Sequence, residues 1–532
     1  MLSSMTLRRQ THLGSTDTKS LTIVDFVPPT NESSSGKDKR TFILQLPDEL
    51  LEPTLELAAS EPDSRSRGLY GTICNYGALL VLSRVCQRLK PVAQQLLYRN
   101  ICVMKQAGVA ADMVPPSIRV IKLHRTLRER EDFRQHCRSL YVRIPDFSTL
   151  PKGVNAYSIA QDLARWLINT RKLSVHGGFN DEDELEGDRH NKNTWNLIGL
   201  VSANFKNLEH LDLSREGRGL YVPAIFERFA CPRLKTLQLH GISESKHQAV
   251  QLEPEKRRTA PFTSFRIFDY EERPEATFLL IQWPAALTHF TFGSFYSNAH
   301  VMDYPMFENW LLIHRHTLTH IDIGYLRGPS RLFNATLFPS LEFLRLSRWQ
   351  MRSPVQFSTE DANVLGPRLK TFSWNFNIHD QHSEDWSAFG EPEANWVRDL
   401  AKCAAERKAV LAMVEIQFDP NSFWGTKEEM GYPWDRMDKV RDQTLKPNGM
   451  YLVYSEPPID RDAWLKYVRT GKVDAGLFCE GADEASINHA AEDQHSNGPD
   501  EQENAGMDEP ELQSAYHGED IRGYFVRKPK TS

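Results

Sequence analysis

The stretch Leu208-Glu209-His210-Leu211-Asp212-Leu213-Ser214 sets the pattern that decides the fold. Side chains along an extended strand point alternately to opposite faces, so Leu211 and Leu213 share one face. The polar side chains of His210 and Asp212 share the other face. A strand with this alternation is expected to bury its apolar face and to leave its polar face exposed.

Eight copies of this pattern follow one another, each with apolar residues at its first, fourth and sixth places. They begin at Leu208, Leu234, Phe262, Leu287, Leu318, Leu341, Leu369 and Leu411. Degenerate copies precede them at Cys137-Leu140-Val142 and Thr170-Leu173-Val175. Most starts lie 23 to 31 residues apart, and only the last step, of 42 residues, is longer. This is close to the length of one unit in repeat proteins that pair a strand with a helix.

The residues that should face outward from these strands provide an independent test of the pattern. The third, fifth and seventh places of the eight copies hold 24 residues, of which only Phe268, Phe343 and Met413 are hydrophobic. At the chain-wide hydrophobic fraction of 40%, about ten would be expected. The alternation therefore predicts strands with one buried face and one polar face.

Stretches with helical character separate the strands. They cover residues 159–167, 195–205, 225–229 and 307–313. Strands that alternate with helices at this spacing predict an α/β solenoid whose parallel strands line one curved face. An all-β parallel helix, on which acids along the strand faces would cleave a polysaccharide, is the rival architecture, and the helical stretches disfavour it.

The array, residues 130–420, resembles leucine-rich repeats in an irregular form. The ninth place of that repeat, which its family fills with Asn or Cys, does not form a regular ladder here. Residues at that place are Glu216, Ile242, Tyr270, Phe295, Leu326, Trp349 and Asn377. Uneven curvature of the solenoid is therefore expected. Residues 421–478 break the rhythm and are rich in aromatic residues, so we interpret them as a cap over the open end of the solenoid.

A second region, residues 41–105, is predicted to form helices ahead of the repeats. The hexapeptide Leu46-Pro47-Asp48-Glu49-Leu50-Leu51 has the chemistry of a helix start, because Pro at the first helical position loses no hydrogen bond and acids there suit the helix dipole. Apolar residues recur at helical spacing over residues 79–89, and Pro91 can open a further helix. Pro53 is expected to kink or end the first helix.

The order of these segments resembles the F-box motif of fungal-type proteins. The segments are Leu46-Pro47-Asp48-Glu49-Leu50-Leu51, Leu82-Ser83-Arg84-Val85-Cys86-Gln87-Arg88-Leu89 and Leu96-Leu97-Tyr98-Arg99-Asn100-Ile101. The resemblance covers about 60 of the 532 residues. It implies a module that binds a Skp-type adaptor and, through it, the cullin of an SCF ubiquitin ligase. It also implies adaptor contacts by Leu46, Pro47, Leu50, Leu51, Leu55, Leu82, Val85, Cys86 and Leu89. An ordinary helical cap, packed on the next domain, is the alternative.

The overall composition limits the classes of partner. The net charge is −6, which disfavours a nucleic-acid binder that neutralises phosphates. The chain has no run of 18 apolar residues, so no membrane span is expected. Its seven cysteines are scattered and form no CxxC pair, which indicates a reducing compartment, the cytoplasm or the nucleus.

Both ends of the chain are expected to be disordered. Residues 1–40 are polar and rich in Ser and Thr. Residues 479–532 are expected to form an acidic tail, because between Cys479 and Asp520 there are thirteen acids and no Lys or Arg. Such a segment repels itself and cannot bury enough apolar surface to fold.

A search for catalytic chemistry finds no strong motif. The chain has no GxxxxGK[ST], GxGxxG or GxSxG motif. His314, His316, His320 and Asp322 form the best metal-like cluster, but the strand pattern there sends neighbours to opposite faces, so we expect no metal and no cofactor. Lys256, Arg257 and Arg258 form a small basic patch. The sequence thus predicts no enzyme.

These observations predict a non-catalytic substrate receptor of an SCF-type ubiquitin ligase. The polar solenoid face would bind an unknown protein substrate through His210, Asp212, Gln238, His240, Arg266, His289, His320, Asp322 and Arg345. The alternative is an F-box-like structural or interaction protein that acts outside a ubiquitin ligase. The sequence does not name the substrate, because a polar face fixes a surface chemistry and not a partner.

Overall fold

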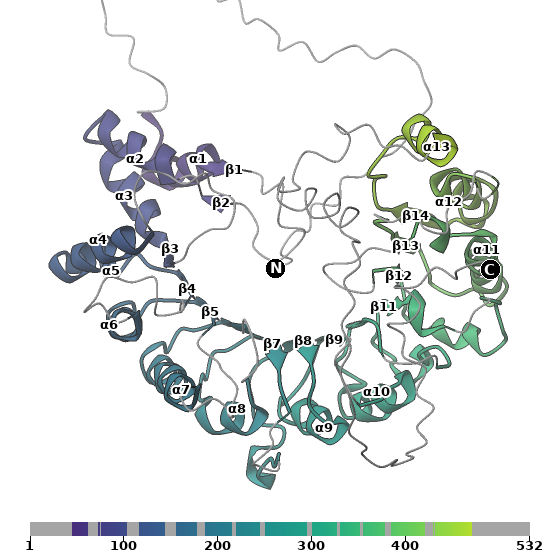
Figure 1. Ribbon diagram of the computed structural model, residues 1–532, viewed down its shortest axis with the longest axis horizontal. Coiled ribbons are helices and arrows are strands. Elements are labelled where there is room, and N and C mark those ends of the chain that lie inside the picture. The colour runs from purple at the N-terminus through teal and green to yellow at the C-terminus, as the bar shows by residue number, and fades with distance from the viewer. Residues whose placement is uncertain are drawn as a thin grey trace, which may run out of the picture. The chain divides into compact units, whose positions relative to one another are not determined.

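The computed structural model describes residues 45–61, 73–74, 76–103, 116–143, 156–177, 187–214, 220–244, 250–294, 300–326, 330–351, 355–377, 385–420, 429 and 431–470. The predicted arm of residues 1–40 and the acidic tail of residues 479–532 lie outside these ranges. The chain divides into two compact units, one up to Pro458 and one from Ile459 onward. The described part of the second unit holds helix α13 (Arg461–Thr470). The first unit, drawn in Figure 1, carries the features that follow.

The first unit contains a sheet of twelve strands. The strands lie in the sheet in the order in which they follow one another in the chain, from β3 to β14. Each neighbouring pair in it runs parallel. The strands are β3 (Asn100–Val103), β4 (Ser139–Arg143), β5 (Lys172–His176), β6 (His210–Ser214), β7 (Thr236–Ile242), β8 (Ser264–Tyr270), β9 (His289–Ser294), β10 (His320–Ile323), β11 (Phe343–Ser347), β12 (Thr371–Asn375), β13 (Met413–Gln417) and β14 (Tyr451–Tyr454). A separate antiparallel pair joins β1 (Ser60–Glu61) to β2 (Ile73–Cys74).

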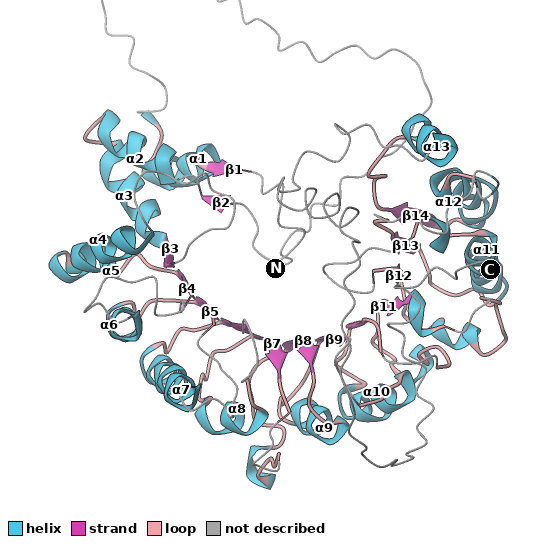
Figure 2. Cartoon of the chain, viewed as in Figure 1, coloured by secondary structure: helices cyan, strands magenta, loops and turns pink. Residues whose placement is uncertain are grey.

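Helices connect the strands, and these helices all lie on the same side of the sheet (Figure 2). They are α4 (Pro116–Glu129), α5 (Glu131–Arg134), α6 (Ala156–Trp166), α7 (Gly187–Asn204), α8 (Val222–Arg228), α9 (Pro274–Gln282), α10 (Tyr304–Leu311), α11 (Glu391–Glu406) and α12 (Pro433–Val440). Short 3-10 turns take the place of a helix between β10 and β12. No helix in the described ranges is both long and apolar enough to cross a membrane.

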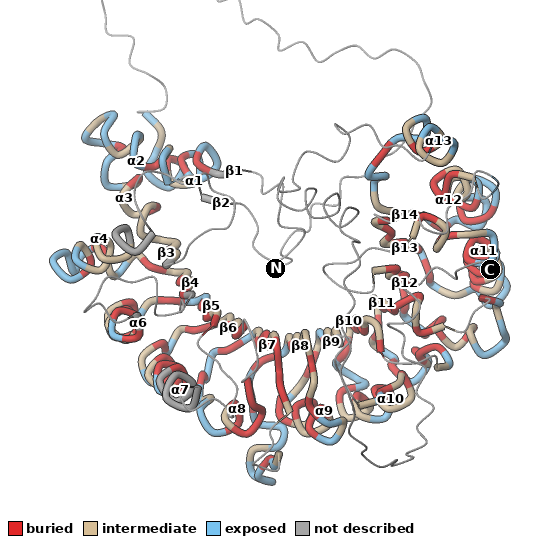
Figure 3. The backbone as a smooth tube through the Cα atoms, viewed as in Figure 1, coloured by how far each residue is buried: buried red, intermediate tan, exposed pale blue. Residues whose placement is uncertain are grey.

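The register of the strands confirms the predicted alternation. The fourth places of successive copies pair with one another, as in Leu211 with Leu237 and Ile321 with Leu344. These side chains are almost completely buried. Buried positions recur along the strands and along the helices that connect them (Figure 3). The prediction of an α/β array in which parallel strands alternate with helices is therefore confirmed. The all-β alternative is wrong, because helices of up to 18 residues join the strands.

Apolar side chains take the place of the polar ladder that regular leucine-rich repeats carry. Ile242, Tyr270 and Leu326 occupy the ninth place of their copies and are fully buried. Trp349 lies at the same place and donates its indole N–H to the Phe376 carbonyl at 2.6 Å. Each turn is thus stabilised by its own local contact, since no single side chain repeats along the array.

The sheet extends beyond the predicted array at both ends. Strand β3 lies in the range that was expected to be helical, and β14 lies in the range interpreted as a cap. Helix α4 was not expected between the module and the array. Both added strands have only four residues, and such a short stretch shows too little alternation for a strand to be predicted from it.

Three helices precede the sheet: α1 (Asp48–Ala58), α2 (Tyr76–Val85) and α3 (Leu89–Arg99). They share a small apolar core. The core consists of Leu51, Leu55, Ala59, Leu79, Leu89 and Leu96. Arg88 donates to the Leu46 carbonyl at 2.6 Å, and Arg99 pairs with Glu52 at 2.9 Å. These polar contacts join α1, and Leu46 ahead of it, to the two ends of α3.

The expectation that Pro53 would end the first helix is wrong, because α1 continues through Pro53 to Ala58. The expected kink at Pro53 stays a prediction. Proline removes one donor, which would have bonded to the carbonyl of Glu49. Both Glu49 and Pro53 are exposed, so water can satisfy that carbonyl. The buried contacts of Leu51 and Leu55 then hold the rest of the helix.

A buried ion pair fastens α11 to the sheet. Arg348, which follows β11, donates through Nη2 and Nε to Oε1 of Glu393 at 2.6 and 3.1 Å. The other carboxylate oxygen of Glu393 accepts the backbone N–H of Gly390 at 2.9 Å and so caps the start of α11. Both side chains are buried, which makes the loss of either partner more costly than the loss of both.

We predict that Glu393→Gln, which keeps the cap but removes the charge, destabilises the protein by about 3–5 kcal/mol. Arg348→Met should cost a similar amount, and the double variant should cost clearly less than the sum. Urea unfolding followed by tryptophan fluorescence measures all three. Lys370→Met, which breaks the exposed pair with Glu342, is the control and should cost less than about 1 kcal/mol. Additive losses in the double variant would contradict the assignment.

Candidate functional site

The polar face of the sheet is built from two parallel rows of side chains. The first row begins the strands and runs from His210 on β6 to Phe343 on β11. The second row lies two residues further along each strand, from Asp212 to Arg345. Because parallel strands stay in register, each side chain lies beside its counterparts on the two neighbouring strands, about 4.8 Å away. We call this surface the polar sheet face.

All nine residues that the sequence assigned to a substrate face lie on these strands. The first row contains His210, His289 and His320, the second row contains Asp212, Gln238, Arg266, Asp322 and Arg345, and His240 lies two residues beyond Gln238. The structure brings some of them into contact, whereas Arg266 has no partner among the residues that the structure describes. Their assignment to a substrate remains a prediction.

His289 and His320 form a stacked pair in the first row. Their ring centroids are 4.2 Å apart with an interplanar angle of 14°, and Phe343 continues the stack at 5.6 Å from His320. The hydroxyl oxygens of Thr288 and Thr319 lie 2.9 Å from Nδ1 of the histidine that follows each of them. The rings therefore present their Nε2 edges outward.

The hydrogen bonds of the two threonine hydroxyls support one tautomer assignment for both rings. The Thr288 hydroxyl donates to the Thr263 carbonyl, and the Thr319 hydroxyl donates to the Thr288 carbonyl, each at 3.1 Å. A hydroxyl has a single proton, and we assign it to the carbonyl, so that each threonine oxygen accepts the bond from its histidine. Nδ1 therefore carries the proton in His289 and His320. Their Nε2 atoms are bare acceptors, and they have no hydrogen-bond partner within the described residues.

The same histidines are held in the neutral form. Desolvation by the neighbouring strands, then the proximity of His320 and of Arg266, lowers the pKa of His289 to about 4. Desolvation also lowers the pKa of His320 and of His210. At neutral pH the three histidines of the first row are therefore uncharged.

Charge is concentrated in the second row, where Arg345 joins two carboxylates. Its guanidinium lies 3.2 Å from Asp322 and 3.4 Å from Glu415, and it donates to the Ser373 hydroxyl at 3.0 Å. Desolvation raises the pKa of Asp322, and the nearby Arg345 opposes that rise. This network satisfies Arg345 internally, so it contributes mainly to the rigidity of β10 to β13.

His240 is likewise engaged with its neighbours. It pairs with Asp269 at 2.5 Å and contacts the Ser214 hydroxyl at 3.1 Å. Asp269 lies at a bulge in β8 with a φ of 49°, a left-handed conformation that is uncommon for a residue other than glycine. The bulge turns the carboxylate toward His240.

Arg266 is different from the other charged residues of the face. Its guanidinium makes no hydrogen bond or ion pair with any residue that the structure describes. Its strand neighbours in the second row are Gln238 and Thr291, which are uncharged. Its charge acts on His210, His289 and Asp322, whose pKa values it lowers. The centre of the polar sheet face therefore holds a cation, beside the stacked histidines, that has no partner among the described residues.

The metal-like cluster of the sequence does not assemble. His314 is buried, accepts the Leu287 N–H at 3.3 Å and contacts the Ile281 carbonyl at 2.9 Å, so both ring nitrogens are used. His316 is exposed and lies beside Arg315, whereas His320 belongs to the stack. Among the described residues no group of three or more His, Cys, Asp or Glu could hold a metal ion.

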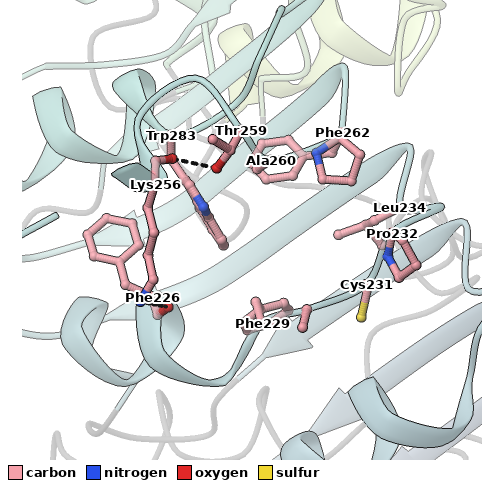
Figure 4. Close-up of a pocket in the computed structure, with 12 residues that line it drawn as sticks. Phe226, Phe229, Cys231, Pro232, Leu234, Lys256, Thr259, Ala260, Phe262 and Trp283 are labelled. Atoms are coloured by element: carbon pink, nitrogen blue, oxygen red, sulfur yellow. Dashed lines mark hydrogen bonds between the residues drawn. The ribbon is translucent and has the colours of Figure 1, made fainter. Parts of the chain in front are cut away.

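Pockets open on the described part of the first unit, and two of them adjoin the ends of the sheet strands. One, of about 320 Å³, lies where the chain enters β7, β8 and β9 and is lined mainly by apolar residues, among them Phe226, Phe262 and Trp283 (Figure 4). Cys231 in its wall contacts the Ser202 hydroxyl, and burial raises the pKa of its thiol, so it is no activated nucleophile. The other, of about 330 Å³, lies at the carboxyl ends of β12 to β14.

The three preceding helices form a second candidate surface. Besides the core, they expose large apolar side chains. The exposed fractions are 54% for Leu50, 77% for Leu57, 63% for Val81 and 62% for Val85. Leu50 and Leu57 are seven residues apart and so lie on one face of α1. The buried Leu51 and Leu55 lie on a different face of the same helix. Both α1 and α2 are thus apolar on two sides, and one of those sides faces solvent.

Sequence reasoning missed the residues that give each surface its character. Thr288 and Thr319 contact Nδ1 of the histidines that follow them, and the repeated Thr-His dipeptide was a signal that could have identified them. Glu415 and Ser373 bond to Arg345 across strands, which no local pattern reveals.

Comparison with known proteins adds no assignment, because no family model and no curated protein matches the chain. The function is therefore argued from the two surfaces alone.

We predict that ring-nitrogen NMR of histidine-labelled protein will show His289 and His320 protonated at Nδ1. His289 should titrate with a pKa of about 4, below the ordinary value near 6.5. Because its folded pKa is lowered, its neutral form should stabilise the fold above pH 6.5, and that stability should be lost as the pH falls toward 4. Thr319→Val removes the hydroxyl that contacts Nδ1 of His320, so the preference for the Nδ1 tautomer should be lost at His320 and kept at His289. Protonation at Nε2 in the wild type would contradict the hydrogen-bond assignment.

Proposed function

We propose that this chain is a substrate-recognition subunit of an SCF-type ubiquitin ligase. The helices α1 to α3 would bind a Skp-type adaptor, and through it a cullin, while the polar sheet face would bind a protein substrate. The chain would contribute no catalytic residue. It would act by proximity, holding the substrate near a separate ubiquitin-transfer enzyme and so raising the effective concentration.

One observation carries the proposal: α1 and α2 expose apolar side chains on the side opposite their own core. Exposed Leu and Val side chains on two helices that share one core are typical of a surface that a partner covers. The F-box resemblance of residues 46–51, 82–89 and 96–101 supplies the identity of that partner. The core of α1 to α3 supports a module that can present such a surface.

The burial of the nine expected adaptor contacts refines this surface. Pro47, Leu50 and Val85 are exposed, and Leu46, Leu82 and Cys86 are partly buried. Leu51, Leu55 and Leu89 are almost fully buried in the core of α1 to α3. As placed, those three can shape the surface but not contact a partner. Leu57, Leu80 and Val81 were not expected, and they extend the exposed apolar surface.

The alternative is an F-box-like interaction protein that acts outside a ubiquitin ligase. In both functions the polar sheet face would bind a partner, but only the ligase function requires binding to the adaptor. Binding to the adaptor therefore separates the two functions.

We predict that the whole chain co-purifies with a Skp-type adaptor at micromolar concentrations. Leu50→Ser with Val85→Ser should weaken that binding at least about tenfold, because two exposed apolar contacts would be replaced by hydroxyls. The fold should survive, since neither side chain belongs to the core. Titration calorimetry measures the affinity, and circular dichroism verifies folding.

Val301→Ser is the matched control, because Val301 is 64% exposed on another part of the chain. It should bind the adaptor like the wild type. If the wild type does not bind the adaptor, or if the double variant binds equally well, the ligase function is lost and the alternative stands.

A further inference from the structure

The unsatisfied guanidinium of Arg266 is the most informative feature of the polar sheet face. A partly buried cation that lacks a partner has lost hydration without gaining a bond, which is costly and uncommon. Arg345 occupies the same row on β11. It shows which bonds an arginine side chain makes when carboxylates are within reach. No described carboxylate lies close enough to do this for Arg266. Within the described residues, the guanidinium of Arg266 is therefore available to an anion.

The neighbours of Arg266 restrict what that anion can belong to. On β9 and β10, His289 and His320 direct bare Nε2 atoms outward, and their Nδ1 protons are committed to Thr288 and Thr319. A lone pair on Nε2 repels an incoming oxygen anion and attracts an N–H donor. The ligand must therefore place a single anionic group on Arg266 and N–H groups beside the histidines.

An extended peptide with one acidic side chain meets both conditions. A carboxylate can accept two parallel bonds from one guanidinium. Main-chain N–H groups of the same segment can donate to the histidines, as donors must when they leave water. A phosphate dianion fits less well, because one cation is available and the flanking Nε2 atoms are acceptors. Nucleic acid fits less well still, since Asp212, Asp322 and Glu415 lie in the same row.

We propose that the polar sheet face binds an extended, acidic segment of a partner protein. An Asp or Glu side chain of that segment pairs with Arg266, and its backbone N–H groups donate to Nε2 of His289 and His320. The inference deepens the proposed function by naming the substrate class, and it rests on that function only in calling the segment a substrate. Peptide binding and adaptor binding are scored separately, so either can fail alone.

The test uses the whole chain as bait for a display library of random short peptides. The enriched peptides should share one Asp or Glu at a fixed position. A synthetic peptide from that set should lose affinity about ten- to a hundredfold when its acid is changed to the amide. Arg266→Gln should cause a similar loss, and the two losses should not add, because they remove the same contact.

His289→Phe with His320→Phe tests the acceptors. Phenylalanine keeps the ring stack that already includes Phe343, so a several-fold loss of affinity reports the Nε2 atoms rather than the stack. Arg257→Gln removes an exposed charge elsewhere and is the matched control, with unchanged binding expected. Arg266→Glu should bind the peptide whose acid is replaced by Lys, which shows that the variant is folded and that charge pairing is direct.

Three results would overturn the proposal. They are a library that yields no enriched peptide, enriched peptides without a shared acid, and an Arg266→Gln variant that binds like the wild type. A phosphoserine peptide that binds more than about tenfold tighter than its glutamate counterpart would overturn the carboxylate assignment in favour of phosphate. If peptides bind as expected and the adaptor does not, the site stands and the ligase function fails.

Discussion

The parallel register of twelve strands is the constraint on which the rest of the structure depends. Because each strand pairs in parallel with the next strand in the chain, equivalent residues of every copy form continuous rows across the sheet. The apolar rows, such as Leu211, Leu237 and Phe265, lie against the helices and are almost fully buried. The opposite rows remain polar, so a change in register by one residue would bury charges and expose the core. The same constraint that stabilises the fold thus sets the chemistry of the exposed face.

Register also explains why similar side chains behave differently along the rows. Arg345 is satisfied because the neighbouring strands place Asp322 and Ser373 beside it. Arg266 occupies the equivalent place on β8, but its neighbours are Gln238 and Thr291. The histidines are fixed by threonines that end the preceding turns, so their acceptor atoms are organised before any ligand arrives. Preorganised groups lose less entropy on binding, which favours specificity at a small site.

The sequence predicted the features that depend on local periodicity. The eight strand starts, the outward polarity of residues such as His210 and Asp212, and the intervening helices all follow from spacing. Tertiary context decided the rest. Pro53 lies within a helix because exposure and the core contacts of Leu51 outweigh one lost hydrogen bond. The contact between Arg345 and Glu415 spans 70 residues, and no periodic pattern can reveal such a pair.

The account assigns separate roles to two surfaces, an apolar one on α1 and α2 and a polar one on the sheet. Hydrogen exchange of the whole chain, with and without a Skp-type adaptor, tests this division most directly. The account predicts slower exchange in α1 and α2 when the adaptor is present, and unchanged exchange in β6 to β10. Protection of the strands with no change in the helices would contradict it.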